Sequence, residues 1–394
     1  MNGLPPMPER VVLPAGFRAA GIHCGLKPGG KFDLGLLLAD AAVPAAALFT
    51  RNRLNGAHVT VCRRHLRASK GMVRAVLVNA KNANCATGEQ GVEDAVACCA
   101  EVARRIDCPV EQVLMISTGV IGAMLPRQRI VAGLDELIER ASVDGGRDFA
   151  NAIMTTDTYP KALDAARDAV HVAGFAKGSG MIHPDMATML GFLLADGSFA
   201  DVESGQAALR RIADRTLHRV TIDGDTSPND TLLLLHGGAA TEPGALEDLL
   251  TDVATNLARH IAADGEGATR LVTVEVRGAP DPAAAALVGR VIATSPLVKT
   301  AIAGRDPNWG RILAAAGRAG VTFLPEQSKV WVGDVAVYTD GVPQPQNEPA
   351  ASTHLREQTS VRIGIDLGAG TAEADVWTCD FTADYVQINA DYRS

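Results

Sequence analysis

The sequence has few aromatic residues, no C-x-x-C spacing and no excess of basic charge. Its seven cysteines are scattered over 394 residues, so the pattern predicts neither a disulfide framework nor a metal site. A formal net charge of -8 offers no basic surface for a nucleic acid. These absences favour small molecules or other protein subunits as partners.

Long apolar runs are also missing. The most apolar window, Leu34–Phe49, is interrupted by Asp40 and Pro44 and is shorter than the ~20 residues that cross a bilayer. Residues 1–16 lack the basic segment followed by an apolar stretch that marks a signal peptide. We therefore expect a cytoplasmic protein without a membrane partner.

Apolar residues make up 47% of the chain and charged residues 21%, as in ordinary globular proteins, and the length suggests about two domains. Strand-like and helix-like segments are interspersed, which predicts an α/β fold with layered sheets covered by helices. The predicted strands are Val73–Val78, Val113–Ser117, Met189–Leu194, Leu232–Leu235 and Leu271–Val276. The predicted helices are Gly91–Arg105, Arg127–Ala141, Gly205–Leu217, Ala245–Ala263 and Pro282–Val291. The polar, proline-containing segment Tyr338–Glu357 is interpreted as a linker or as one surface loop.

One segment has an unusual composition. In Ala176–Leu190 a glycine-rich turn is followed by Pro184 and then by a small residue directly before Thr188, which opens an apolar strand. The glycines complete neither a dinucleotide-binding fingerprint nor a phosphate-binding loop. Threonine often begins a strand for its β propensity alone. The residue types by themselves therefore leave a structural and a nucleophilic role for Thr188 open.

The order of motifs resembles the ornithine acetyltransferase family, also called bifunctional glutamate N-acetyltransferases. The family junction, Lys-Gly-Ser-Gly-Met-Ile followed after a short gap by Met-Ala-Thr-Met-Leu, is matched by Lys177–Ile182 and Met186–Leu190. Asp185 departs from the family, which often has asparagine there, and Ser394 stands where threonine is also usual. Further matching blocks are Asn79–Asn84, Ser117–Gly122, Met154–Thr158, Asp223–Thr231, Gly265–Thr269, Gly304–Arg311 and Ile388–Tyr392.

The resemblance implies a self-cleaving fold with an N-terminal threonine nucleophile and a smaller C-terminal subdomain. Scission of the Ala187-Thr188 bond would give an alpha chain, 1–187, and a beta chain, 188–394, that share one core. The chemistry suits this, because a threonine hydroxyl needs a base and the new α-amino group has a pKa of about 7.7 to 8.0. Nucleophile and base would then belong to one residue.

The resemblance also implies roles for individual residues. The Thr118 hydroxyl and the Gly119 amide would stabilise the oxyanion of the tetrahedral intermediate. Lys177 would meet the substrate carboxylate and Glu266 its α-amino group. Thr155, Asn389 and the terminal Ser394 would make the remaining polar contacts, so the C-terminus is predicted to fold back into the site. The blocks Asn79–Asn84 and Gly304–Arg311 receive no defined role.

The implied reaction transfers acetyl from N-acetylornithine to glutamate, as in cyclic arginine biosynthesis. No metal or cofactor is expected, and the use of acetyl-CoA as a second donor stays open. The resemblance further implies a heterotetramer of two alpha and two beta chains. Two alternatives remain: an aminopeptidase or amidase that uses the same threonine, and an uncleaved, non-enzymatic binding protein.

Overall fold

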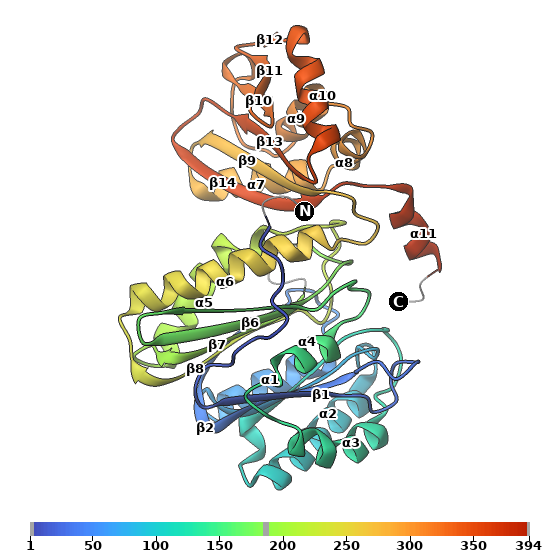
Figure 1. The fold of residues 1–394 in the computed structure, drawn as a ribbon, viewed down its shortest axis with the longest axis vertical. Coiled ribbons are helices and arrows are strands. Elements are labelled where there is room, and N and C mark those ends of the chain that lie inside the picture. The colour runs from blue at the N-terminus through green and yellow to red at the C-terminus, as the bar shows by residue number, and fades with distance from the viewer. Residues whose placement is uncertain (1–3, 184–188, 392–394) are drawn as a thin grey trace.

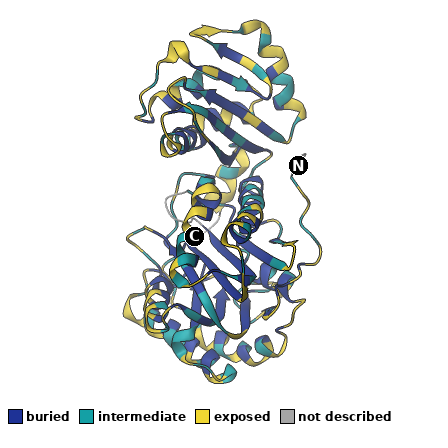
Figure 2. Cartoon of the chain, turned by 90° about the vertical axis from the view of Figure 1, so that its left-hand side faces the viewer, coloured by how far each residue is buried: buried dark blue, intermediate teal, exposed yellow. Residues whose placement is uncertain are grey.

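The computed structural model describes residues 4–183 and 189–391. Within them the strands form an eight-stranded sheet in the lower body of Figure 1 and a six-stranded sheet in the upper body. The strands are largely buried, whereas the outer faces of many helices are exposed (Figure 2). The chain thus has the layered α/β architecture that the sequence predicts.

The eight-stranded sheet has the order β4-β3-β2-β8-β7-β6-β5, with β1 paired to β2. The β3–β4 and β7–β8 pairs are parallel and the other pairs are antiparallel. Its strands are β1 (Phe17–Ile22), β2 (Leu34–Phe49), β3 (Met72–Asn79), β4 (Val113–Ser117), β5 (Lys161–Arg167), β6 (Val170–Lys177), β7 (Leu190–Ser198) and β8 (Thr231–Ala240).

Helices cover this sheet, and the longest of them lies between the two bodies. Helix α6 begins with Pro243 in its first turn, where proline is tolerated, and the Glu242 side chain accepts hydrogen bonds from the N–H groups of Gly244 and Ala245. Its apolar residues pack with α5 and strands β6 to β8 in one core. The helices are α1 (Ala57–Ala68), α2 (Gly88–Ile106), α3 (Arg127–Glu139), α4 (Gly146–Ile153), α5 (Val202–Arg215) and α6 (Pro243–Ala263), with short 3-10 turns at Val110–Gln112 and Leu217–Arg219.

The six-stranded sheet has the order β12-β11-β10-β13-β9-β14 and forms a smaller C-terminal subdomain with its own core. Its strands are β9 (Leu271–Ala279), β10 (Lys329–Val332), β11 (Val335–Thr339), β12 (Val342–Pro343), β13 (Ser360–Asp366) and β14 (Ala372–Cys379). Its helical elements are α7 (Pro282–Ala293), α8 (Pro296–Ala303), α9 (Trp309–Gly317), α10 (Glu348–Glu357) and 3-10 turns at Pro325–Gln327 and Pro345–Asn347. The last helix, α11 (Ala383–Asp391), returns toward the lower body (Figure 1).

The prediction for Tyr338–Glu357 was wrong. This segment is neither a linker nor one loop, because it contains β12 and α10, and α10 buries Ala351 and Leu355 in the core of the C-terminal subdomain. Pro349 lies in the first turn of α10, where a missing N–H costs no helical hydrogen bond. Proline therefore opens a helix here rather than interrupting one.

The window Leu34–Phe49 is a single strand, β2, which the sequence did not predict. The pairing of β2 with β3 shifts register between Leu38 and Val43, around the exposed Asp40. Such an irregularity accommodates a polar residue and Pro44 in a strand that is otherwise well paired. Among the described residues no single helix has the length and apolar composition of a membrane span, and only the pair α7–α8, bent by 60°, meets these criteria jointly.

The two segments on either side of Ala187-Thr188 are interleaved in one sheet. Strand β8 pairs with β2 and β7 pairs with β6, so strands that follow this bond lie between strands that precede it. Ala187 and Thr188 themselves lie outside the described residues. Strands from both segments therefore contribute to one sheet, and the cleavage that would make them two chains stays a prediction.

Candidate active site

A cavity of about 130 Å³ gathers residues from segments that lie far apart in the sequence, from Thr118 to Asn389. Six of the predicted site residues line it: Thr118, Gly119, Thr155, Lys177, Glu266 and Asn389. Leu190, the first residue of β7, and Met189 directly before it line the cavity as well. The predicted residues Thr188 and Ser394, and the cleavage residue Ala187, lie outside the part of the chain that is described.

The turn that carries Thr118 and Gly119 follows β4 and rests on the Asn79–Asn84 block. The Thr118 N–H donates to the Asn79 carbonyl at 3.0 Å, and the Val120 N–H donates to the Lys81 carbonyl at 3.1 Å. Gly119 has φ +131°, and a Cβ atom there would lie 2.2 Å from the Lys81 carbonyl carbon. Only glycine fits this position. The block Asn79–Asn84, whose role the sequence left undefined, supports the turn through these two hydrogen bonds and this close contact.

Asn229 ties the same turn to the loop before β8. Its Nδ2 donates to the Ser117 carbonyl at 2.7 Å and to the Ala83 carbonyl at 2.5 Å. The side chain thus bridges β4 and the Asn79–Asn84 block from a third segment. Its Oδ1 is buried without a hydrogen-bond partner among the described residues.

Lys177 ends β6 and presents its ammonium to the cavity beside Thr155. Its Nζ donates to Thr155 Oγ1 at 3.1 Å. Burial lowers the pKa of Lys177, while the carboxylates of Asp157 and Asp230 act in the opposite direction. A partly desolvated ammonium of this kind attracts a carboxylate more strongly than one in water does.

Glu266 lies on the loop after α6 and packs against the glycine-rich turn. Its N–H donates to the Ser179 carbonyl at 2.8 Å, and a Cβ atom on Gly180 would lie 2.4 Å from its Oε2. The same Oε2 accepts a hydrogen bond from Asn389 Nδ2 at 2.8 Å. The anion and the amide predicted for the site therefore touch each other.

Helix α11 brings Asn389 to the cavity although none of its residues, Ala383–Asp391, is buried. Tyr385 Oη donates to Asp223 Oδ2 at 3.3 Å, and the same carboxylate accepts the N–H groups of Met181 at 2.6 Å and Ile182 at 2.9 Å. Asp223 thereby joins the C-terminal helix to the turn that precedes the predicted cleavage bond. As far as Asn389, the chain folds back as predicted.

Asp230 is the most unusual residue that the sequence prediction missed. It lines the cavity, only 2% of its surface is exposed, and its Oδ2 has no hydrogen-bond partner within the described chain. Burial raises its pKa well above the usual range of an aspartate, against the lowering effect of Lys177. Asp230 belongs to the block Asp223–Thr231, which matches the family. That match marked the block, but an aspartate in a sequence does not by itself indicate a site residue. The other missed lining residues are Thr156, Gly180, Met181, Met189, Leu190, Ser227 and Asn229.

A larger cavity, of about 810 Å³, lies beside Leu4–Met7, Tyr159 and His260, and none of the predicted site residues that are described lines it. The block Gly304–Arg311 contributes no lining residue to the smaller cavity. Within this block, Asn308 caps α9 by accepting a hydrogen bond from the Arg311 N–H at 3.1 Å. In residues 4–183 and 189–391, no group of three or more His, Cys, Asp or Glu side chains is placed to hold a metal ion.

The smaller cavity therefore combines a cation, carboxyl groups and amide donors above a tightly constrained Thr-Gly turn. Its polar groups are complementary to a small zwitterionic molecule such as an amino acid. Together with the layered α/β fold, this arrangement defines the class as an enzyme that works on amino-acid derivatives.

Comparison with known proteins identifies the family. Residues 18–394 match the ArgJ family model. The chain is 45% identical to the arginine biosynthesis bifunctional protein ArgJ of Prochlorococcus marinus, over 99% of this chain and 94% of that protein. It is 44% identical to the protein of the same name from Synechocystis, over 98% of each chain. The chain belongs to the ArgJ family, and the resemblance inferred from the motifs is confirmed.

The chain is also similar to a solved structure. The arginine biosynthesis bifunctional protein ArgJ from Bacillus halodurans is 36% identical, and its alignment covers 52% of this chain and 100% of that chain with a TM-score of 0.49.

Proposed function

We propose that this chain transfers the acetyl group of N-acetylornithine to glutamate, giving ornithine and N-acetylglutamate for arginine biosynthesis. One observation carries the proposal: six residues chosen from separate motifs line one cavity in a member of the ArgJ family. The cavity supplies a cation for a carboxylate and an anion for an amine, as an amino-acid substrate requires.

The proposed enzyme first cleaves itself. Thr188 Oγ attacks the Ala187 carbonyl carbon, the C–N bond breaks in an N-to-O acyl shift, and water hydrolyses the resulting ester. The products are chains of 187 residues and 394 − 187 = 207 residues. The interleaved strands support this step, because they keep both products in one sheet after the bond is cut.

Acetyl transfer then repeats the same chemistry on the substrate. Thr188 Oγ loses its proton to its own α-amino group and attacks the acetyl carbonyl, and the ornithine amine leaves with a proton. The glutamate amine attacks the acetyl ester and restores the hydroxyl. The Thr118 hydroxyl and the Gly119 N–H are proposed as donors to the oxyanion in both half-reactions.

We assign the substrate contacts by the cavity lining. Lys177 meets the α-carboxylate and Glu266 the α-amino nitrogen, while Thr155, Asn389 and Ser394 supply further polar contacts. The proposed working form is a cytoplasmic heterotetramer of two alpha and two beta chains that needs no metal or cofactor. Acetyl-CoA enters this proposal only as a second donor to be tested beside N-acetylornithine.

The test measures transfer and hydrolysis together. Purified chain is incubated with N-[¹⁴C]acetylornithine, with and without glutamate, and labelled N-acetylglutamate is separated from labelled acetate. Label in N-acetylglutamate supports the transferase. Acetate as the main product would favour the amidase, and the absence of any acetyl-enzyme would favour a binding protein. Labelled acetyl-CoA in a parallel reaction decides whether it is a donor.

The same preparation tests the cleavage. Denaturing mass spectrometry is expected to find the two fragments in the active protein, and one chain of 394 residues in the Thr188→Ala variant, which has no hydroxyl nucleophile. Full turnover by a continuous chain would contradict the mechanism.

A further inference from the structure

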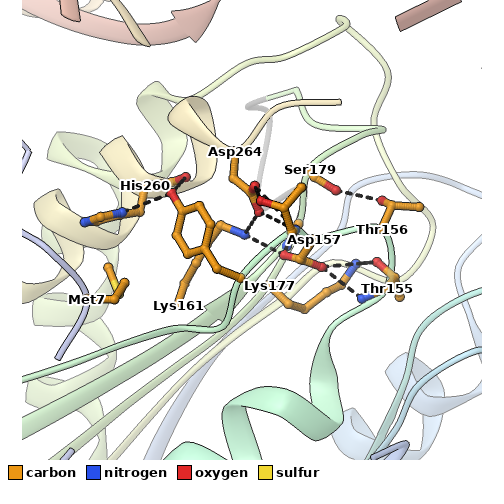
Figure 3. Close-up of polar contacts among 12 residues, drawn as sticks. Met7, Thr155, Thr156, Asp157, Lys161, Lys177, Ser179, His260 and Asp264 are labelled. Atoms are coloured by element: carbon orange, nitrogen blue, oxygen red, sulfur yellow. Dashed lines mark hydrogen bonds and ion pairs between the residues drawn. The ribbon is translucent and has the colours of Figure 1, made fainter. Parts of the chain in front are cut away.

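A cluster of buried charges lies next to the backbone of Thr155 and Gly178, beside the smaller cavity (Figure 3). Lys161, on β5, is 0% exposed, and its Nζ lies 2.7 Å from Asp157 Oδ1 and 2.6 Å from Asp264 Oδ2. The side chains of these two carboxylates are 0% and 1% exposed. We call Asp157, Lys161 and Asp264 the buried triad.

Each carboxylate of the buried triad also holds backbone near the cavity. Asp157 accepts the Gly178 N–H at 2.7 Å and the Thr155 N–H at 2.9 Å. Asp264 accepts the N–H of Thr158 at 3.1 Å and also its hydroxyl. Thr155 is a lining residue and Gly178 follows Lys177, so the triad fixes the backbone at two of the proposed substrate contacts.

The buried triad is an expensive way to gain stability. Removing three charges from water costs several kcal/mol for each ion, and apolar residues of similar volume often serve a fold as well. Two carboxylates facing one ammonium also leave an excess negative charge. The second ammonium that acts on Asp157 is Lys177, and with Lys161 it holds the pKa of Asp157 below its usual range although burial opposes ionisation.

Within the described chain, Lys177 nevertheless does not bond to Asp157. It donates instead to Thr155 Oγ1 at 3.1 Å, whereas Asp157 Oδ1 is already engaged by Lys161 and the Gly178 N–H. Thr155 N–H occupies Asp157 Oδ2 at 2.9 Å. Lys161 thus fills the position on Asp157 that a neighbouring ammonium would otherwise take.

We infer that Lys161 is a positioning residue for substrate binding: by occupying Asp157 it leaves the Lys177 ammonium at Thr155, facing the substrate carboxylate. This inference rests on the proposed function, in which Lys177 meets that carboxylate. Lys161 touches no substrate and acts only through Asp157 and Lys177.

The charged groups that act on Lys177 come from several elements. Asp157, Asp230 and Glu266 favour its charged form, whereas Lys161 disfavours it. Burial lowers the pKa of Lys27 to about 8, and the positive charge of Lys177 contributes to this lowering. Removal of the Lys161 charge should therefore draw Lys177 toward Asp157 and raise the pH at which Lys177 deprotonates.

The main test uses the double variant Lys161→Met/Asp264→Asn. It removes one cation and one carboxylate from the buried triad, so the remaining Asp157 is balanced by Lys177 alone. We expect KM for N-acetylornithine to rise by about tenfold, kcat to stay within about threefold, and the alkaline loss of substrate affinity to shift to higher pH.

Lys299→Met is the matched control. Lys299 is 1% exposed on α8 and donates to Thr378 Oγ1 at 2.7 Å and to the Cys379 carbonyl at 2.5 Å, away from the cavity lining. Its loss should lower thermal stability without shifting the pH at which substrate affinity is lost. A general effect of deleting a buried lysine would instead appear in both variants.

The single variant Asp157→Asn tests the opposite change, because it removes a negative rather than a positive charge near Lys177. It removes a carboxylate that keeps Lys177 charged, so the alkaline loss of affinity should move to lower pH, while the isosteric amide retains the shape of the site. Opposite shifts in these two variants support the inference. If the pH at which substrate affinity is lost were unchanged in both variants, or if kcat fell at constant KM, the inference would be overturned. Wild-type transfer activity, measured alongside, separates this result from a failure of the proposed function.

Discussion

Replacing Gly119 by alanine tests the proposed oxyanion donor most directly. The new Cβ would lie 2.2 Å from the Lys81 carbonyl carbon and 2.6 Å from the Asn82 nitrogen. Ordinary contacts between carbon atoms are about 3.5 to 4.0 Å, so the turn must move by more than about 1 Å. The φ of +131° adds backbone strain of about 1 to 3 kcal/mol, because residues with a side chain rarely adopt it.

A shift of this size should remove the Gly119 N–H from the oxyanion. Loss of one such donor costs about 3 to 4 kcal/mol of barrier, so kcat of the cleaved enzyme is expected to fall by about 10² to 10³. KM should change little, since the donor acts on a charge that develops in the transition state. The measurement is steady-state transfer, normalised to the fraction of cleaved chain.

Gly122→Ala is the matched control in the same loop. Gly122 also has a positive φ, +83°, but a Cβ atom added there would have no atom within 4 Å. Alanine should cost about 1 to 2 kcal/mol of folding stability from backbone strain and leave kcat nearly unchanged. If Gly119→Ala retained the kcat of Gly122→Ala, the assignment of the Gly119 amide as an oxyanion donor would be refuted.

Two further predictions concern the carboxyl groups of the cavity. Since burial raises the pKa of Asp230 in the folded state, the unfolded chain releases this proton first, and the stability contribution is lost as pH rises from about 4 through the folded pKa. Asp230→Asn should therefore gain thermal stability relative to wild type as pH increases, measured by melting at pH 4 to 8, and a constant difference in melting temperature would argue against a raised pKa of Asp230 in the folded state. Asn389→Ala removes the 2.8 Å hydrogen bond to Glu266 from an exposed helix, so KM should rise by about tenfold at unchanged melting temperature, and an unaltered KM would exclude Asn389 as a substrate contact.

The sequence predicts regular elements best where local pattern and burial agree. The predicted strand Val113–Ser117 coincides with β4, all five of whose residues are buried, and the predicted helix Ala245–Ala263 differs from α6 only at its start. Failures occur where a local signal has two meanings. Pro349 indicates a loop by its composition although proline also begins helices, and Asp40 suggests an interruption although β2 passes it with a shift in register.

Prediction of the site from the sequence has a different limit. Lys177, Glu266 and Asn389 are predicted through family resemblance, and their convergence on one cavity could not be derived from spacing, because they lie on β6, a loop after α6 and α11. Asp157 and Asp230 were missed as site residues because a carboxylate in a sequence is usually exposed. Their chemistry depends on burial next to an ammonium, which only the fold creates.

The sheet topology also bears on why cleavage would not separate the two products. Strand β8 shares five residue pairs with β2, and β7 shares six with β6, so the proposed beta chain is paired with the alpha chain along both edges of its β7–β8 unit. Separation would break both ladders and expose apolar strands on which the cores of the lower body depend. A single peptide bond contributes little to that association, whereas its scission frees the amine that the proposed chemistry requires. We therefore expect the fold to accept the proposed break, because the interleaved strands, rather than chain continuity, hold the two products together.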